Sequence, residues 1–168
     1  MEKELPVRKK IRLEGYDYSK EGCYFITICI KNGHLILWRP GDIGTHVGTH
    51  IVRPPPPPLP LSDIGNVVKV AVENIPKIYE GVFVDNFVIM PNHIHLIVRI
   101  ESDGRTLCVP TISRVIKQCK EYATKKIGYS IWHTRFHDRI IRDEEEYQNK
   151  WRYIDENPAK WVEDEYHG

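Results

Sequence analysis

Two histidines one residue apart, His93 and His95, are the side chains whose types and spacing most directly suggest chemistry. They begin an alternating apolar run that predicts a β-strand, in which residues two apart lie on one face, about 7 Å apart along the backbone. Two neutral imidazoles placed in this way can share one divalent metal ion. Two ordinary surface histidines are the alternative. A histidine-triad hydrolase would need a third histidine at position 97, which is Ile97.

The residues that alternate with the histidines predict which way the imidazoles point. In a strand, these residues share the face opposite to the histidines. All of them are apolar, so this face is expected to enter the main core, and the imidazoles are expected to point away from it. The residues concerned are Ile94, Leu96, Val98 and Ile100.

Tyr153 is the second side chain suited to chemistry, and it lies in a helix expected to begin after Asp143. Asp143, with Glu146 three residues later, resembles a capping box. Tyr153 lies roughly 100–120° around this helix from its apolar stripe. It falls instead on a polar line with Glu146, Lys150 and Asn157, where a core tyrosine is not expected. The apolar stripe comprises Tyr147, Trp151 and Ile154.

Asn157 follows Tyr153 by four residues, so the two side chains are expected about 6 Å apart on one helix face. The amide oxygen of Asn157 is a candidate third metal ligand beside two imidazoles, and the phenol of Tyr153 would then lie next to the ion. The alternative is a surface tyrosine and an asparagine that ends the helix, because Pro158 disfavours helical geometry in the residue before it.

The elements that must position these side chains predict an α+β fold. Their order is strand, helix, strand, strand, helix, strand, helix, as in a ferredoxin-like antiparallel sheet (βαββαβ) with an added C-terminal helix that carries the tyrosine. The first two helices are expected to cover one sheet face, and the last helix to lie near the other. Asn32-Gly33 predicts a hairpin turn, with His34–Trp38 as the returning strand. The main strands are expected at 23–31, 82–90, 93–100 and 136–141, and the helices at 62–79, 111–127 and 143–157.

Length and composition favour one domain, residues 1–168, that is large enough for a hydrophobic core. Hydrophobic residues make up 41% of the chain and charged residues 28%. No apolar run approaches the roughly 20 residues that a membrane helix needs. The N-terminal residues lack the apolar stretch of a signal peptide. A cytoplasmic protein is therefore expected.

The Gly/Pro-rich segment and the cysteines also predict local structure. Residues 39–60 are rich in glycine and proline and include five consecutive prolines, 54–58, which predict a stiff surface loop or a site for a proline-binding partner. The cysteines form no CxxC pair, so reduced thiols are expected rather than a structural zinc site. They are Cys23, Cys29, Cys108 and Cys119.

Basic residues form local clusters, although the formal net charge is only +1. Such clusters can follow the phosphates of a nucleic acid, and each can alternatively be a solvated face. The first two clusters are the candidates for DNA binding. The clusters are Arg8, Lys9, Lys10 and Arg12; Arg114, Lys117, Lys120, Lys125 and Lys126; and Arg135, Arg139 and Arg142.

Taken together, these motifs resemble the REP-associated tyrosine transposases, relatives of the single-tyrosine insertion-sequence transposases. The histidine pair matches the HUH motif, in which U is a hydrophobic residue, and residues 153–158 (YIDENP) match the tyrosine helix. Residues 15–18 (GYDY) and 140–143 (IIRD) add to the resemblance, which extends from about residue 8 to residue 161. Residues 39–60 have no counterpart with an assigned role.

The resemblance implies a metal-dependent enzyme that cleaves and rejoins single-stranded DNA near hairpins. His93 and His95 would bind a divalent ion, Mg²⁺ or Mn²⁺, and Asn157 would complete the site. Insertion-sequence relatives often carry glutamine where this chain has Asn157, so a bridging water is an alternative to direct ligation. Tyr153 would attack the scissile phosphate, giving a 5′-phosphotyrosine and a free 3′-hydroxyl. The resemblance leaves the oligomeric state open between a homodimer and a monomer, since relatives include dimers that share active sites and monomers that do not.

The chemistry of a phenol is consistent with these roles. A free tyrosine has a pKa of about 10 and is a weak nucleophile at neutral pH. A metal ion that polarises the phosphoryl oxygens compensates for this weakness. Two other functions stay open: a nucleic-acid-binding module that has lost its chemistry, and a metal-dependent nuclease that uses water and not Tyr153.

Overall fold

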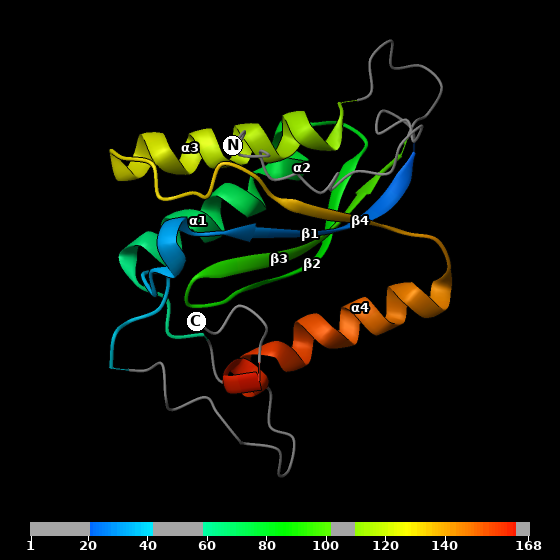
Figure 1. Ribbon diagram of the computed structural model, residues 1–168. Coiled ribbons are helices and arrows are strands. Elements are labelled where there is room, and N and C mark those ends of the chain that lie inside the picture. Colours follow the sequence, from blue (N-terminus) through cyan, green and yellow to red (C-terminus); the bar gives the residue numbers. More distant parts are fainter. Residues whose placement is uncertain (1–20, 42–58, 102–109, 164–168) are drawn as a thin grey trace, which may run out of the picture.

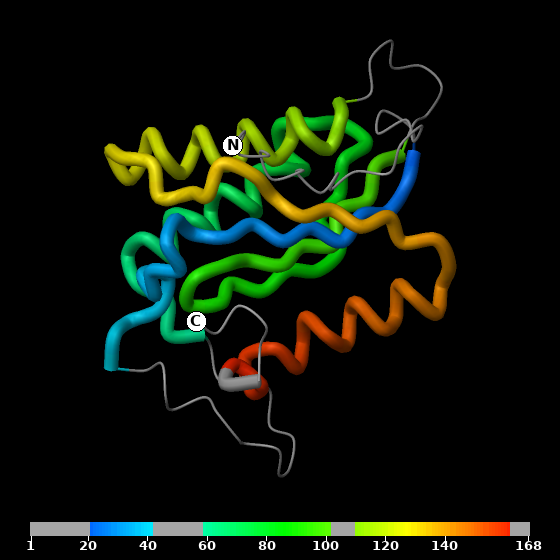
Figure 2. Tube along the Cα trace, in the orientation of Figure 1, coloured from blue at the N-terminus to red at the C-terminus, as the bar shows by residue number. Residues whose placement is uncertain are grey.

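The computed structural model describes residues 21–41, 59–101 and 110–163, with 162 and 163 as backbone only. A four-stranded antiparallel sheet with the strand order β2-β3-β1-β4 forms the centre. Helices α1, α2 and α3 lie on one side of it and α4 on the other (Figures 1 and 2). This arrangement confirms the expected α+β architecture and the placement of the helices. The strands are β1 (Gly22–Cys29), β2 (Val82–Ile89), β3 (His93–Ile100) and β4 (His137–Ile141), and the helices are α1 (Asp63–Glu73), α2 (Ile75–Ile78), α3 (Ile112–Ile127) and α4 (Glu144–Glu156).

The two central strands, β1 and β3, fix which side chains share each face of the sheet. Their antiparallel register places Thr27 opposite His95 and Ile28 opposite Ile94. Directly opposed residues point to the same side of a sheet. Thr27 therefore shares the α4 side with the histidines, while Ile28 and Ile94, both 0% exposed, pack into the core beneath α1 and α3.

Local sequence signals explain the boundaries of α1 and α3, the two long helices that cover one face of the sheet. Ser62 is the N-cap of α1, and its hydroxyl accepts a hydrogen bond from the N–H of Gly65 at 3.0 Å. Thr111 caps α3 in the same way, and Gly128 ends that helix with a left-handed φ of 93°. At Gly65, a Cβ atom would lie 2.1 Å from the carbonyl oxygen of Leu37, so only glycine lets the two backbones approach.

The prediction of one helix over residues 62–79 is wrong in its second half. The helix ends at Glu73, and the separate short helix α2 follows from Ile75. Pro76 lies in the first turn of α2, where its missing N–H costs nothing. Inside a continuous helix, the same proline would have removed a hydrogen bond and clashed with the preceding turn.

The predicted hairpin after β1 is also wrong. Asn32 and Gly33 do adopt the left-handed φ values of turn residues, 57° and 66°. They lie, however, in a 3₁₀ turn over Lys31–Gly33, and His34–Trp38 is not a strand. The reason is tertiary: β3 and β4 already occupy both edges of β1, so no edge remains for a returning strand.

The start of α4 agrees with the predicted cap. The Asp143 carboxylate accepts a hydrogen bond from the N–H of Glu146 at 2.7 Å, and Glu146 in turn accepts from the N–H of Arg142 at 3.1 Å. The α-helical geometry ends at Glu156, as Pro158 predicts, and the chain continues as a 3₁₀ helix, η2, over Asn157–Glu163. This continuation was not predicted.

Two smaller expectations, on the cysteines and on membrane helices, can be compared with the structure. Within the described ranges, Cys23, Cys29 and Cys119 form no disulfide bond, while Cys108 lies outside them. In those same ranges, no helix is both long and apolar enough to cross a membrane. Most of the 39–60 segment lies outside the described residues. That all 168 residues form one domain stays a prediction.

Candidate active site

The histidine pair lies between the sheet and the C-terminal helices. His93 and His95 point to the α4 side, as the alternation of β3 predicts, yet both are 0% exposed. The rings of Phe25, Tyr153 and Trp161 surround them. The alternative of two surface histidines is therefore wrong. A buried imidazole pair must satisfy its nitrogens with nearby groups, and the structure shows which groups these are.

Each imidazole has one nitrogen directed at the other ring and one held by a neighbouring side chain. The two Nε2 atoms are 2.9 Å apart. Nδ1 of His93 lies 2.8 Å from Oδ1 of Asn92, and Nδ1 of His95 lies 2.9 Å from the hydroxyl of Thr27. Asn92 and Thr27 thus orient the two rings, in the way that side chains around a metal site orient its histidine ligands.

The hydrogen positions follow from what each partner can do. A carbonyl oxygen only accepts, so Nδ1 of His93 donates to Asn92, and the Nε2 of His93 carries a lone pair. The Nε2–H of His95 then donates to that lone pair. The Thr27 hydroxyl consequently donates to Nδ1 of His95. Because a hydroxyl can also accept, this network can reverse at Thr27 when the proton of His95 moves to Nδ1.

The electrostatic surroundings keep His95 neutral. Burial is the largest cause that lowers its pKa well below the ordinary value, and the neighbouring His93 and the cationic Lys150 lower it further. A neutral imidazole retains the lone pair that metal ligation requires. At neutral pH, His95 is therefore a competent ligand without first losing a proton.

Tyr153 lies against this pair. Its ring centroid is 5.2 Å from that of His95 and 5.8 Å from that of Phe25, both in edge-on arrangements. The ammonium of Lys150 lies 5.5 Å from the centre of the Tyr153 ring and 4.5 Å from that of Phe25. Tyr153 is half-buried, which agrees with the expectation that it is not a core tyrosine. The helix presents both Tyr153 and Ile154 to the sheet.

Asn157 and Trp161 follow Tyr153 in the chain, and both are buried. Asn157 is the C-cap of α4 and only 3% exposed. Trp161, one turn further along η2, is 1% exposed, and its ring lies 6.0 Å from that of His93. The sequence analysis predicted the two histidines, Tyr153 and Asn157 as site residues, and the structure brings Tyr153 against His95. It missed several neighbours, which are Phe25, Thr27, Asn92, Lys150 as a cation at the site, and Trp161.

The nitrogen atoms of the pair fit a shared divalent ion. In an octahedral site with bonds of 2.0–2.1 Å, adjacent ligands are about 2.9 Å apart, which is the separation of the two Nε2 atoms. In the part of the chain that the structure describes, no group of three or more histidine, cysteine or acidic side chains could hold a metal. The remaining positions would therefore fall to the amide of Asn157, to water or to a substrate oxygen.

The proposed DNA-binding cations are distributed differently. Arg114 and Lys117 are exposed on α3, and Lys120 is half-buried there, on the opposite side of the sheet from the histidines. Lys120 donates to the carbonyl oxygens of His133 and Arg135, at 3.0 and 3.2 Å. The N-terminal cluster, which is Arg8, Lys9, Lys10 and Arg12, lies outside the described residues.

Three known proteins are similar to this chain in sequence or in fold. An uncharacterised protein of Haemophilus influenzae is 34% identical over an alignment of 179 positions, which covers 94% of this chain and 92% of that protein. A second H. influenzae protein, described as a candidate REP-associated tyrosine transposase, is 24% identical over 154 residues, covering 86% of this chain and 74% of its own. A solved structure, of a REP-associated tyrosine transposase bound to a REP hairpin, has a TM-score of 0.61 at 20% identity, over 89% of this chain and 74% of that one. No protein-family model matches the chain.

Proposed function

The chain belongs to one family with the uncharacterised Haemophilus influenzae protein and resembles the REP-associated tyrosine transposases, and from this premise we propose that it is a metal-dependent enzyme that cleaves and rejoins single-stranded DNA. The observation that carries the proposal is the contact of Tyr153 with the buried histidine pair, 5.2 Å between the rings of Tyr153 and His95. This contact brings a nucleophile beside two candidate metal ligands. We also assign the sheet to the ferredoxin-like class, on its strand order β2-β3-β1-β4.

In the proposed reaction, the phenolic oxygen of Tyr153 attacks the scissile phosphorus. A bond forms between that oxygen and phosphorus, the bond from phosphorus to the 3′-oxygen breaks, and the 3′-oxygen leaves as a hydroxyl. The proton lost by the phenol balances the one gained by the leaving oxygen. The product is a 5′-phosphotyrosine. Because the exchange conserves one phosphoester bond, the 3′-hydroxyl of another strand can reverse it without a nucleotide cofactor.

The remaining residues of the site have supporting roles in this proposal. His93, His95 and the Asn157 amide would hold the divalent ion, which when bound polarises the phosphoryl oxygens. Mg²⁺ or Mn²⁺ is the ion expected at this site. Lys150, beside the Tyr153 ring, places a positive charge where the scissile phosphate would lie. The substrate is expected to be hairpin-bearing DNA, since the structural neighbour was solved with a REP hairpin.

The test mixes the protein, Mn²⁺ and single-stranded DNA that carries a REP hairpin and flanking sequence, and separates the products on a denaturing gel. We expect a slowly migrating protein–DNA adduct with the wild type and none with Tyr153→Phe. Tyr147→Phe is the matched control, because Tyr147 lies on the same helix, and its hydroxyl contacts Asp85 at 3.1 Å. The control should form the adduct.

Two other outcomes correspond to the two alternative functions. Hairpin binding with neither cleavage nor adduct would indicate a binding module without chemistry. If the DNA is cleaved without an adduct, and Tyr153→Phe still cleaves it, the protein is a nuclease that uses water. Either result would overturn the proposal. A homodimer and a cytoplasmic location stay predictions.

A further inference from the structure

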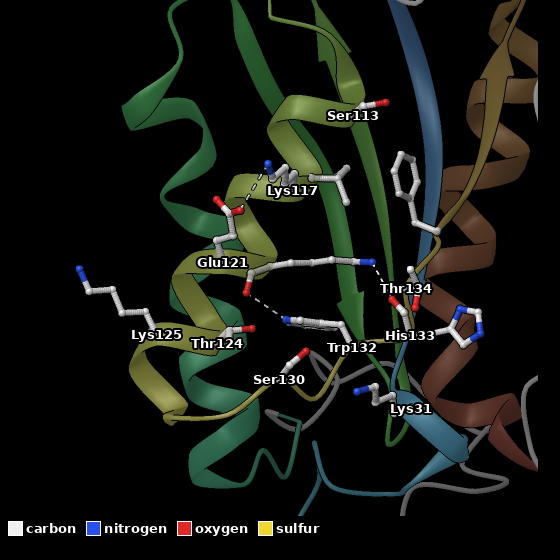
Figure 3. A pocket seen from close by; sticks show the side chains of 13 residues that line it. Lys31, Ser113, Lys117, Glu121, Thr124, Lys125, Ser130, Trp132, His133 and Thr134 are labelled. Atoms are coloured by element: carbon white, nitrogen blue, oxygen red, sulfur yellow. Dashed lines mark hydrogen bonds and ion pairs between the residues drawn. The ribbon is translucent and has the colours of Figure 1, made fainter.

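A second concave site lies on the side of the sheet opposite to the histidine pair. It is a groove of about 680 Å³ between α3 and the segment of residues 130–136 that leads into β4 (Figure 3). This volume is in the range of small-ligand sites, roughly 300–1,000 Å³. The proposed chemistry at Tyr153 does not use it. The residues that define its character are Lys31, Lys117, Lys120, Lys125, Trp132 and Phe136.

The charge of the groove favours an anion. Four lysines line it against one acidic residue, Glu121, which pairs with Lys117 at 3.7 Å. Lys120 has a structural role, because its ammonium donates to the carbonyl oxygens of His133 and Arg135. The remaining lysines are exposed, and Lys31 approaches from the end of β1, across the groove from α3. Cations therefore stand on α3 and, across the groove, on the turn after β1, as binding of a chain of phosphates would require.

Aromatic and hydroxyl side chains complete the lining and favour a nucleotide over a simple anion. The half-buried Phe136 and the indole of Trp132 belong to the wall formed by residues 130–136, and the Trp132 N–H donates to the backbone oxygen of Lys120 at 3.0 Å. An aromatic ring beside a basic groove accepts unpaired bases regardless of sequence, because every base has a π-face. Four hydroxyls, those of Ser113, Thr124, Ser130 and Thr134, add polar contacts.

Backbone hydrogen bonds connect this groove to the proposed active site around one end of the sheet. The N–H of Lys31 donates to Ile131, and the N–H of His133 to Cys29, at 2.8 and 2.9 Å. The N–H of Ile30 donates to Asn92, the residue before His93, at 2.8 Å. Neighbouring strands lie 4.7–4.9 Å apart, so the groove wall at Trp132 and the start of β3 are separated by about 10 Å of backbone.

We infer that the groove between α3 and residues 130–136 binds the single-stranded DNA that flanks the hairpin, with phosphates at Lys31 and Lys117 and a base against Phe136. The inference rests on the proposed function for the identity of the nucleic acid. It adds a holding site for the single strand, separate from the site of cleavage.

The experiment measures binding of a fluorescent oligo-dT single strand by anisotropy, over a series of salt concentrations and without added metal. The groove variant is Lys31→Gln with Lys117→Gln. The matched control is Lys69→Gln with Lys77→Gln, which has the same net charge and replaces two exposed lysines outside the basic clusters. Lys69 forms an equivalent helical ion pair with Glu73 at 3.8 Å, and neither control lysine lines the groove.

The groove variant should bind oligo-dT several-fold more weakly, and its salt slope should fall by roughly 1.4, at about 0.7 for each lost phosphate contact with a single strand. Phe136→Leu should weaken binding by roughly fivefold, the lower end of the effect of base stacking on one ring. The control should match the wild type. Thermal melts of all variants establish that they are folded.

Three results would overturn the inference. The first is unchanged oligo-dT affinity in the groove variant, and the second is an equal loss of affinity in the control. The third is displacement of oligo-dT by polyglutamate as effectively as by unlabelled oligo-dT, which would indicate a site for acidic peptides. The assay is independent of cleavage. A wild type that forms the Tyr153 adduct while the groove variant binds normally refutes only the groove. A wild type that binds through the groove but forms no adduct refutes only the proposed function.

Discussion

Thr27→Val is the substitution that best tests how the histidine pair is organised. The hydroxyl of Thr27 lies 2.9 Å from Nδ1 of His95, and both side chains are buried, at 3% and 0% exposure. Valine keeps the shape of threonine but replaces the hydroxyl with a methyl group. It therefore removes the partner of a buried imidazole nitrogen without opening a cavity or changing the strand propensity of β1.

The size of the effect follows from two separate costs. A buried nitrogen without a hydrogen-bond partner costs about 1–3 kcal/mol of unfolding free energy. For a chain of 168 residues, each kcal/mol lowers the melting temperature by about 2–4 °C, so a decrease of roughly 2–12 °C is expected. Loss of a group that orients a metal ligand typically weakens metal binding by about 10- to 100-fold. The second cost applies because a metal ion bound to Nε2 of His95 would leave the ring proton on Nδ1. The Thr27 hydroxyl would then accept a hydrogen bond from that nitrogen and orient the ring.

Calorimetric titration with Mn²⁺ measures the second effect, and differential scanning calorimetry of the metal-free protein measures the first. Thr27→Ser is the control, since serine keeps the hydroxyl and loses one buried methyl group, about 0.8 kcal/mol. The serine variant should thus be less stable than the wild type but bind Mn²⁺ comparably. Equal Mn²⁺ affinity in Thr27→Val and the wild type would refute the orienting role of Thr27. Absence of Mn²⁺ binding by the wild type would refute the metal site itself.

Two further predictions concern stability. The pKa of His95 is lowered in the folded protein, first by burial, so below about pH 6.5 the unfolded chain binds one more proton there, and the unfolding free energy should fall by about 1.4 kcal/mol per pH unit. Urea denaturation of the metal-free protein at several pH values measures this slope, and a slope identical in His95→Gln would contradict the assignment. Gly65→Ala should destabilise the protein by about 1–3 kcal/mol, despite the better helix propensity of alanine, because its Cβ would meet the carbonyl oxygen of Leu37 at 2.1 Å. Gly41→Ala, where nothing lies within 4 Å, is the control for thermal melts, and equal stability of the two variants would refute the close-approach argument.

Elements whose signals are local were predictable from the sequence. The strand β3 has the predicted bounds, because the alternation of residues 93–100 has a period of two and Pro91-Asn92 marks its start. The cap at Asp143 depends only on residues within one turn, and its hydrogen bond to Glu146 is present. The split between α1 and α2 also has a local cause, Pro76, which the helical periodicity of the surrounding apolar residues obscured.

What the sequence pattern did not predict depends on contacts between distant segments. The turn residues Asn32 and Gly33 carry a valid hairpin signal, but pairing of β1 with β3 and β4 overrides it. Thr27 and Phe25 face the site only because β1 pairs with β3 in one register, which no property of either segment alone reveals. The burial of Tyr153 likewise depends on how α4 lies across the sheet. A helical wheel gives the relative directions of its side chains but not the width of the face that the sheet covers.

The joining of α4 to β4 bears on how many DNA ends one molecule can process. Only two residues, Arg142 and Asp143, separate the end of β4 from α4, and Tyr153 contacts His95 of its own chain. Under the proposed function, each polypeptide has one Tyr153 and forms one covalent attachment per round. An exchange of strands between two cut ends would therefore consume two polypeptides, or require one to complete two successive rounds.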